Sequence, residues 1–153
     1  SDRRVIVSGW NVAELDMMAL PPCHMDYRFV AFENPRVLNL VMTIRSWDLF
    51  LGAPANIAAT SIFLAIMARL AGFEPGVVTI QATNAHIYED DFDQVRELLA
   101  REHLDAPKLI LSDNIKRIER LEDVAGAFTR IEPTDITLEG YESHAAIKAP
   151  MAA

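Results

Sequence analysis

Residues 23–45 read CHMDYRFVAFENPRVLNLVMTIR, and this stretch decides the fold. Its two runs rich in β-branched and aromatic residues, 27–32 and 37–45, are typical of strands. Asn34-Pro35, between the two runs, is a turn signal. The stretch therefore predicts a β-hairpin that places Cys23 just before one strand and Arg45 at the end of the other.

A strongly apolar segment follows the hairpin. Gly52 and Pro54 indicate a loop, Asn56 is expected to cap a helix over residues 57–70, and Gly72 is expected to end it. The helix is apolar nearly all round, which predicts a buried central helix. Its apolar run is shorter than the ~20 residues needed to cross a bilayer, so we expect no membrane span.

The remaining segments predict a mixed α and β architecture around one sheet, without repeats or a domain boundary. Asn11 and Glu14 form a capping-box pattern for a short helix that ends before Pro21-Pro22. An acidic run at 89–91 favours the start of a second helix that continues to about Glu102. Further strands are expected at 77–82, 108–111 and 135–138, with an amphipathic segment at 118–128.

Composition limits the classes of function. The chain has 153 residues, a net charge of −8 and a single cysteine. Excess acid lies outside the first 45 residues, so a general nucleic-acid interface is not expected, whereas a small anion held by a few arginines is compatible with the sequence. One cysteine excludes an intramolecular disulfide, and no signal peptide opens the chain, so the cytoplasm is the expected location.

Cys23 is either a small core residue or a nucleophile. A cysteine attacks as its thiolate, which requires nearby positive charge and access to substrate. Arg3, Arg4 and Arg45 are the candidate cations. His24 is adjacent, but neighbouring residues of an extended chain point to opposite sides, which disfavours a Cys/His pair.

Several blocks together resemble the thymidylate synthase family. The segments 3–11 and 18–24 resemble the approach to that family's catalytic cysteine, and 45–58 (RSWDLFLGAPANIA) resembles its phosphate and pyrimidine loop. His86-Ile87-Tyr88 and the C-terminal segment 139–150 resemble its sugar-binding and terminal motifs. The resemblance implies an α+β fold with a mixed sheet packed on a buried central helix, and a sheet face that forms a homodimer interface.

The resemblance also implies a reaction, in which the cysteine thiolate adds to C6 of dUMP. The activated C5 then takes a one-carbon unit from 5,10-methylenetetrahydrofolate, and a hydride from the folate gives dTMP and dihydrofolate. Position by position, Cys23 is the nucleophile, Arg45 and Ser46 hold the phosphate, and Arg45 also favours the thiolate. Asn56 reads the pyrimidine edge, because a carboxamide offers both a donor and an acceptor.

The other implied roles concern the sugar, the folate and the second subunit. His86 and Tyr88 contact the deoxyribose, and Asp48 touches both base and folate, with Gly52 and Ala152 also at the folate. Arg3 and Arg4 cross the dimer interface to the partner's phosphate. No metal is expected, since Glu89-Asp90-Asp91 fits a solvated helix start better than a ligand set. Residues 1–153 are expected to form one catalytic domain that lacks its N-terminal portion.

The blocks also depart from the family pattern. Thr43-Ile44 replaces Tyr-Gln, Trp47 replaces a small residue, and Ala55 replaces a phenylalanine. These changes leave open a pyrimidine-nucleotide hydroxymethylase, in which water replaces hydride in the last step. Asn56 favours uracil over cytosine but does not decide between the two products. A non-catalytic relative that binds a nucleotide or a partner chain is the third reading.

Overall fold

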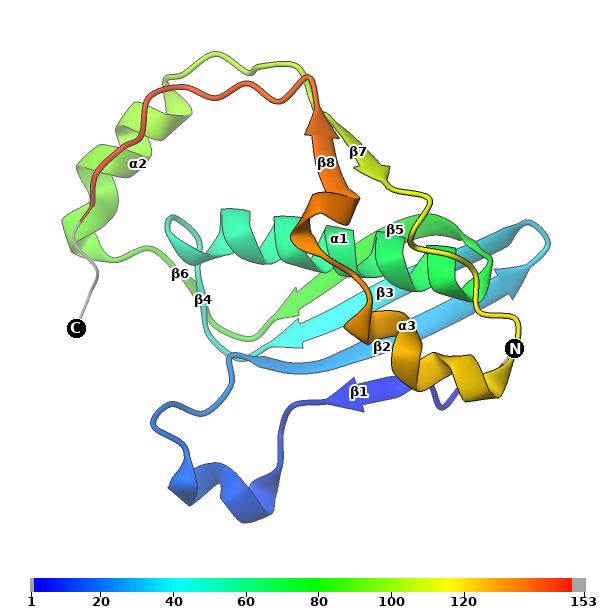
Figure 1. Cartoon of the computed structure of the whole chain (residues 1–153). Helices are drawn as coiled ribbons and strands as arrows, with labels where there is room; N and C mark the ends of the chain where they lie inside the picture. Colours follow the sequence, from blue (N-terminus) through cyan, green and yellow to red (C-terminus); the bar gives the residue numbers. More distant parts are fainter. Residues whose placement is uncertain (1, 150–153) are drawn as a thin grey trace. The chain divides into compact units, whose positions relative to one another are not determined.

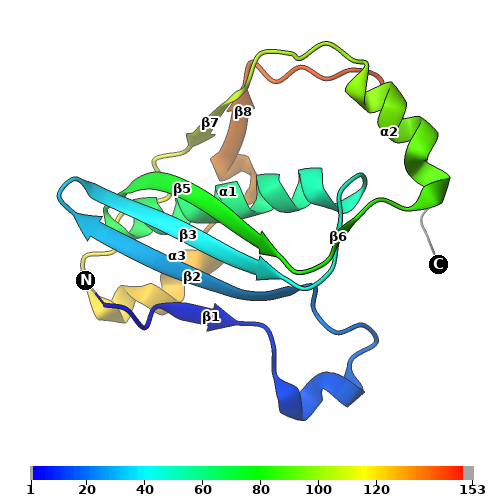
Figure 2. The same ribbon diagram turned by 180° about the vertical axis from the view of Figure 1, so that it is seen from behind.

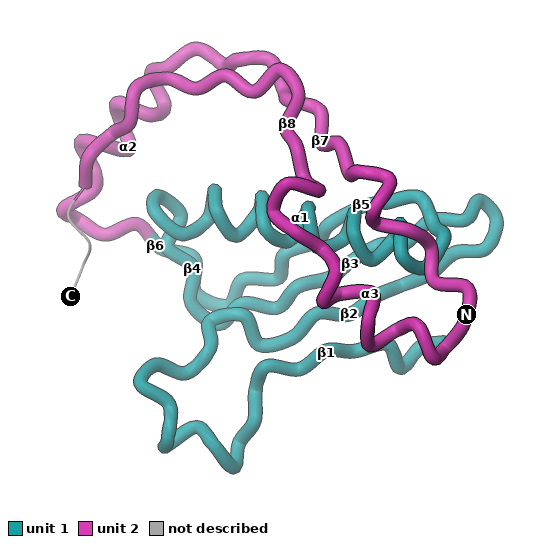
Figure 3. Tube along the Cα trace, viewed as in Figure 1, with its two compact units in different colours: residues 1–86 teal, residues 87–153 magenta. Residues whose placement is uncertain are grey.

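The computed structural model describes residues 2–149 and divides the chain into two compact units, residues 1–86 and 87–153 (Figure 3). Each unit is described by itself. The expectation that both belong to one catalytic domain stays a prediction.

The first unit is built on a four-stranded mixed sheet in the order β1-β2-β3-β5 (Figures 1 and 2). Its strands are β1 (Ile6–Ser8), β2 (His24–Glu33), β3 (Arg36–Ile44) and β5 (Glu74–Ala82). β1 and β3 are antiparallel to β2, whereas β5 is parallel to β3. The predicted hairpin is therefore confirmed, with β2 three residues longer at its start than expected.

The helix α1 (Gly52–Ala71) covers one face of this sheet and makes the crossover between the parallel strands β3 and β5 (Figure 1). Such a crossover is what a parallel pair requires, because a tight turn joins only antiparallel strands. Alternate residues of β3 face the helix and are buried. The mixed sheet packed on a central helix agrees with the predicted fold.

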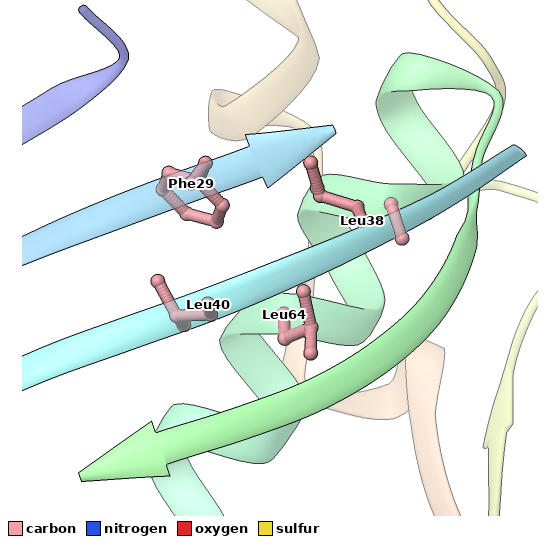
Figure 4. Packing of buried hydrophobic residues seen from close by; sticks show 5 residues of the cluster. Phe29, Leu38, Leu40 and Leu64 are labelled. Carbon is pink, nitrogen blue, oxygen red and sulfur yellow. The ribbon is translucent and has the colours of Figure 1, made fainter. Parts of the chain in front are cut away.

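The core lies between α1 and the two strands of the hairpin, where Phe29, Leu38, Leu40 and Leu64 converge (Figure 4). Leu40 is fully buried and Leu64 is 2% exposed. Full burial of such a side chain contributes about 1.5–3 kcal/mol. Phe63 extends the cluster through edge-to-face contacts with Phe29 and with Tyr27.

The start of α1 differs from the prediction, since the helix begins at Gly52 and not at Ile57. Pro54 lies in its first turn, where a missing N–H costs nothing because that group has no partner within the helix. Asp48 stabilises the turn that leads into the helix, because its Oδ1 accepts from the N–H groups of Phe50 and Leu51. Asn56 is therefore not the helix cap. Gly72 ends the helix as predicted, at a φ of 72°.

Only part of the surface of α1 is buried by the described residues. The side that faces the sheet is covered, whereas Ile57 is 46% exposed. Within the described part of the chain, α1 is the one helix long and apolar enough to cross a membrane. Core helices of soluble proteins have the same composition, and α1 packs against β3 and β5.

Three short elements complete the described part of the first unit. The predicted first helix is a 3-10 helix, η1 (Val12–Met17), whose N-cap Asn11 accepts from the N–H of Ala13. After β3, the two-residue strands β4 (Trp47–Asp48) and β6 (Ala85–His86) pair in parallel.

The second unit contains α2 (Phe92–Leu99), α3 (Val124–Thr129) and an antiparallel pair of strands, β7 (Lys108–Leu111) and β8 (Ile136–Glu139). Three short 3-10 helices complete it: η2 (Glu89–Asp91), η3 (Leu121–Asp123) and η4 (Pro133–Asp135). The predicted second helix thus ends at Leu99, three residues early. The strand at 108–111 agrees with the prediction, and β8 begins one residue later than predicted. The predicted amphipathic segment 118–128 contains η3 and most of α3.

Asp135, which is 3% exposed, fastens the start of β8. Its Oδ1 accepts from the Ser112 hydroxyl and, at 2.9 Å, from the Asn114 amide. Its Oδ2 accepts from the N–H of Glu132 at 2.9 Å. These hydrogen bonds, the one from Ser112 first, lower the pKa of Asp135 below its ordinary value because they favour the charged carboxylate.

Candidate functional site

The candidate site lies where the parallel strands β3 and β5 end. Their carboxyl ends are joined by a hydrogen bond of 3.0 Å from the N–H of Thr83 to the carbonyl of Ile44. In sheets with parallel strands, ligands commonly bind at this edge. The segments that leave the two strands, 45–48 and 83–86, contain four of the predicted site residues: Arg45, Ser46, Asp48 and His86.

Cys23 and Arg45 are neighbours across the hairpin, as the sequence predicted. The N–H of Arg45 donates to the carbonyl of Cys23 at 3.0 Å. The Arg45 guanidinium donates from Nη2 to the carbonyl of Pro21 at 2.7 Å and from Nε to that of Pro22 at 3.1 Å. Arg45 therefore holds the turn that carries the half-buried cysteine.

The remaining donors of Arg45 are available for a ligand. A guanidinium has five N–H donors in a planar fork. Two of them meet the proline carbonyls, and the hydrogen bonds found among residues 2–149 use no others of Arg45. This geometry suits a phosphate, which a guanidinium binds with two parallel hydrogen bonds. Ser46, half-buried, is the next residue along the chain.

Asp48 and His86 face each other in the β4–β6 pair. The pair is closed by backbone hydrogen bonds from Trp47 to Asn84 at 2.7 Å and from Leu49 to His86 at 2.9 Å. The imidazole Nδ1 of His86 lies 3.0 Å from Asn84 Oδ1. Since an amide oxygen accepts, this contact fits the tautomer in which Nδ1 carries the proton.

Asn56 joins this group from the second turn of α1. Its Oδ1 accepts from the indole Nε1–H of Trp47 at 3.2 Å. Gly52 lies close to both Asn56 and Asp48. A Cβ added at Gly52 would lie 3.4 Å from Asn56 Oδ1 and 3.6 Å from the Cβ of Asp48. The structure thus brings Asp48, Gly52 and Asn56 together and adds Trp47, which the sequence analysis noted as a departure but did not place in the site.

Arg3 and Arg4 do not join the group within this chain. They precede β1, whose Ile6 lies opposite Arg28, roughly 16 Å along β2 from Cys23, so the two arginines lie still farther from it. Arg4 is paired with Asp2 through two side-chain hydrogen bonds. Tyr88 belongs to the second unit and is 43% exposed. Ala152 lies outside the described residues.

His24 is engaged with Tyr27. Its Nδ1 and the Tyr27 hydroxyl are 3.0 Å apart, and the rings meet edge to face. Burial raises the pKa of Tyr27 above its ordinary value, so the phenol keeps its proton and can donate. This contact agrees with the expectation that His24 is not the partner of Cys23.

Within residues 2–149 no cluster of three or more histidine, cysteine, aspartate or glutamate side chains could hold a metal ion.

Comparison with known proteins gives one consistent result. The sequence model of the family described as Thymidylate synthase matches residues 1–153. The chain is 43% identical over 151 residues to a thymidylate synthase of Pseudomonas putida and 40% identical over 149 residues to a probable thymidylate synthase of Escherichia phage T5.

A solved structure agrees with these relatives. The thymidylate synthase from T4 phage aligns with a TM-score of 0.87 and 38% identity, over 99% of this chain and 53% of that one. The chain spans about half the length of the curated relatives it matches, for example 47% of the P. putida protein.

Proposed function

The chain belongs to the thymidylate synthase family, and we propose that the full-length protein transfers a one-carbon unit from 5,10-methylenetetrahydrofolate to C5 of dUMP, giving dTMP and dihydrofolate. The observation that carries the proposal is the placement of Cys23, Arg45, Asp48, Asn56 and His86 at one edge of the sheet, where Arg45 holds the turn before the cysteine.

Cys23 is the proposed nucleophile. Its sulfur adds to C6 of the uracil ring, which makes C5 nucleophilic, and C5 then attacks the methylene carbon of the folate. The carbon–nitrogen bonds that hold the methylene to the folate break and the C5 proton leaves, which gives an exocyclic methylene. A hydride from the tetrahydrofolate then completes the methyl group, and the thiolate leaves as the C5–C6 double bond re-forms.

Arg45 and Ser46 are proposed to bind the phosphate of dUMP. The three unused N–H donors of Arg45 supply bidentate contact, and the Ser46 hydroxyl adds a further donor. Arg3 and Arg4, which lie away from Cys23 in the same chain, are proposed to reach the phosphate of a second copy.

The base, sugar and folate roles follow the family pattern. Asn56 reads the uracil edge, and His86 with Tyr88 contacts the deoxyribose. Asp48 touches base and folate, and Gly52 and Ala152 line the folate site. Asp48 also holds the start of α1, so its carboxylate is in place before any ligand binds.

We further propose a cytoplasmic homodimer, formed through the sheet face opposite α1. That face exposes apolar side chains, including Val30 at 41%, Phe32 at 50% and Val77 at 62%. The charges of Arg28 and Asp26 on this face balance each other, because Arg28 Nε donates to Asp26 Oδ1 at 2.8 Å. An apolar, neutral sheet face of this kind favours association with an identical face.

The test is to incubate the full-length protein with dUMP and methylenetetrahydrofolate. Dihydrofolate, followed by its absorbance, and a nucleotide product with the mass of dTMP support the proposal. A product one oxygen heavier, without dihydrofolate, would identify a hydroxymethylase instead. Thermal stabilisation by dUMP with no product would identify a non-catalytic relative.

A further inference from the structure

Trp47 holds the amide of Asn56 in one orientation. The indole Nε1–H donates to Asn56 Oδ1 at 3.2 Å, and both residues are half-buried. The backbone of Trp47 is itself fixed, because its N–H donates to the carbonyl of Asn84 at 2.7 Å. The ring is therefore anchored on β4 while it contacts the second turn of α1.

An asparagine amide is nearly symmetric in shape but opposite in chemistry at its two ends. A half-turn about the last side-chain bond exchanges the acceptor Oδ1 with the donor Nδ2. The indole of tryptophan can only donate. If the amide of Asn56 turned over, Nδ2 would face the Trp47 N–H, and two donors would meet without an acceptor. The contact with Trp47 therefore selects one of the two orientations.

The two orientations suit different pyrimidines. Uracil presents an acceptor at O4 and a donor at N3–H, whereas cytosine presents a donor at its exocyclic amine and an acceptor at N3. An amide that matches uracil in one orientation matches cytosine in the other. A residue that prevents the amide from turning over thus enforces the choice between the two bases.

We infer that Trp47 is a positioning residue for base specificity, which acts through Asn56 and excludes cytosine. The inference rests on the proposed function, which assigns Asn56 to the base and uracil to the substrate. Trp47 needs no contact with the nucleotide for this role. The second lone pair of Oδ1 and both protons of Nδ2 stay available for the base.

The test compares Trp47→Phe, which keeps an aromatic ring and removes the N–H, with the matched control Trp10→Phe at the chain's other tryptophan. Dissociation constants of dUMP and dCMP are measured by calorimetry on the full-length proteins. We expect the ratio of dCMP to dUMP dissociation constants to fall about fivefold in Trp47→Phe and to stay unchanged in Trp10→Phe. Trp47→Leu, also without a donor, gives the same readout should Trp47→Phe fail to fold.

A second measurement examines the hydrogen bond without any nucleotide. The indole N–H resonance of Trp47 is identified in the NMR spectrum by its absence from a donor-free variant. We expect this resonance to move upfield in Asn56→Leu, while that of Trp10 stays in place.

The outcomes separate this inference from the proposed function. If the unmodified protein binds dUMP but the base ratio is unchanged in both donor-free variants, the role of Trp47 is overturned and the proposed function stands. An unmoved Trp47 resonance in Asn56→Leu also overturns it. If the unmodified protein neither binds nor converts dUMP, the proposed function fails first.

Discussion

Cys23 carries the sulfur that the proposed reaction requires, while its backbone carbonyl is held by Arg45. Cys23→Ala removes the sulfur and leaves that hydrogen bond in place. We therefore expect turnover to fall about a thousandfold or more, with the dissociation constant of dUMP changed little. Steady-state kinetics and calorimetry on the same preparations measure the two effects. Loss of dUMP binding as complete as the loss of turnover would contradict the assigned role.

Asn56 is the residue at which base preference is expected to change. In Asn56→Asp a carboxylate accepts from the exocyclic amine of cytosine but cannot donate to O4 of uracil, so the preference for dUMP over dCMP is expected to fall by about tenfold. Competition binding with both nucleotides gives the ratio. Asn11→Asp is the matched control, since it adds the same charge at a helix cap that accepts either residue. A uracil preference that survives in Asn56→Asp argues against base reading by this residue.

The residues of the site were predictable to different degrees. Cys23 and Arg45 were placed together because strand pattern fixes the register of a hairpin, and register decides which residues are opposite. The sequence did not predict that Trp47 lies in the site. Its contact with Asn56, nine positions later, depends on the path of the chain through β4, the following turn and the start of α1. No sequence pattern encodes that path.

At the scale of elements, one end of α1 was predictable from the sequence and the other was not. The glycine that ends it was predicted, because few residues other than glycine adopt a positive φ. The start was predicted five residues late, because Pro54 was read as a loop signal, although proline is accepted in a first helical turn. The two-residue strands β4 and β6 are too short to carry any periodic pattern.

Two glycine substitutions, one at the end of α1 and one inside α3, give a matched pair of stability predictions. Gly72→Ala places a side chain at a φ of 72° and is expected to lower the free energy of unfolding by about 1 kcal/mol. Gly126→Ala, inside α3, meets only Arg130 at 3.9 Å and is expected to raise that free energy by about 0.5 kcal/mol or more. Urea unfolding of the full-length variants measures both. Equal effects of the same sign would contradict the conformational argument.

Asp135 makes the folding stability of the protein depend on pH. Its pKa is lower in the folded protein than in the unfolded chain, so it contributes stability that is fully present above the unfolded value of about 4. The contribution is lost as the pH falls through the folded value. Asp135→Asn is therefore expected to be less stable than the parent at pH 7, with the difference shrinking below about pH 4.

Unfolding of parent and variant by urea from pH 7 to pH 2.5 measures this difference. Asp93→Asn is the control, because Asp93 is paired with Arg96 on an exposed helix surface where ion pairs contribute little. A gap between parent and Asp135→Asn that does not change with pH would show that the hydrogen bonds of the charged carboxylate do not stabilise the fold.

At the scale of the whole molecule, the open sheet face is the proposed dimer surface, and Phe32 is half exposed on it. Phe32→Asp places a charge where two identical faces would meet, so the dimer is expected to dissociate at concentrations at which the parent is dimeric. Analytical ultracentrifugation measures the oligomeric state. Leu99→Asp, at a 79% exposed position of α2, is the matched control. A dimer that persists unchanged in Phe32→Asp would move the interface elsewhere.

The overall architecture was predictable as a class and in its longer elements, whereas the short strands β1, β4 and β6 were not predicted. Strand and helix patterns predicted the hairpin, the central helix and the later strands. The order of the sheet was not predictable from periodicity alone, since the parallel pairing of β5 with β3 depends on how α1 returns the chain across the sheet. Family resemblance carried the roles of the site residues, which remain predictions.

The side chain of Arg45 has two uses in this fold. Its guanidinium stabilises the turn before Cys23 by donating to the carbonyls of Pro21 and Pro22, and its remaining N–H donors can bind an anion. A substitution at this position is therefore expected to change both the proposed anion site and the position of the proposed nucleophile. Lysine, with a single ammonium group in place of a planar fork, cannot reproduce both geometries at once. A change of substrate is therefore expected to come from substitutions at other residues.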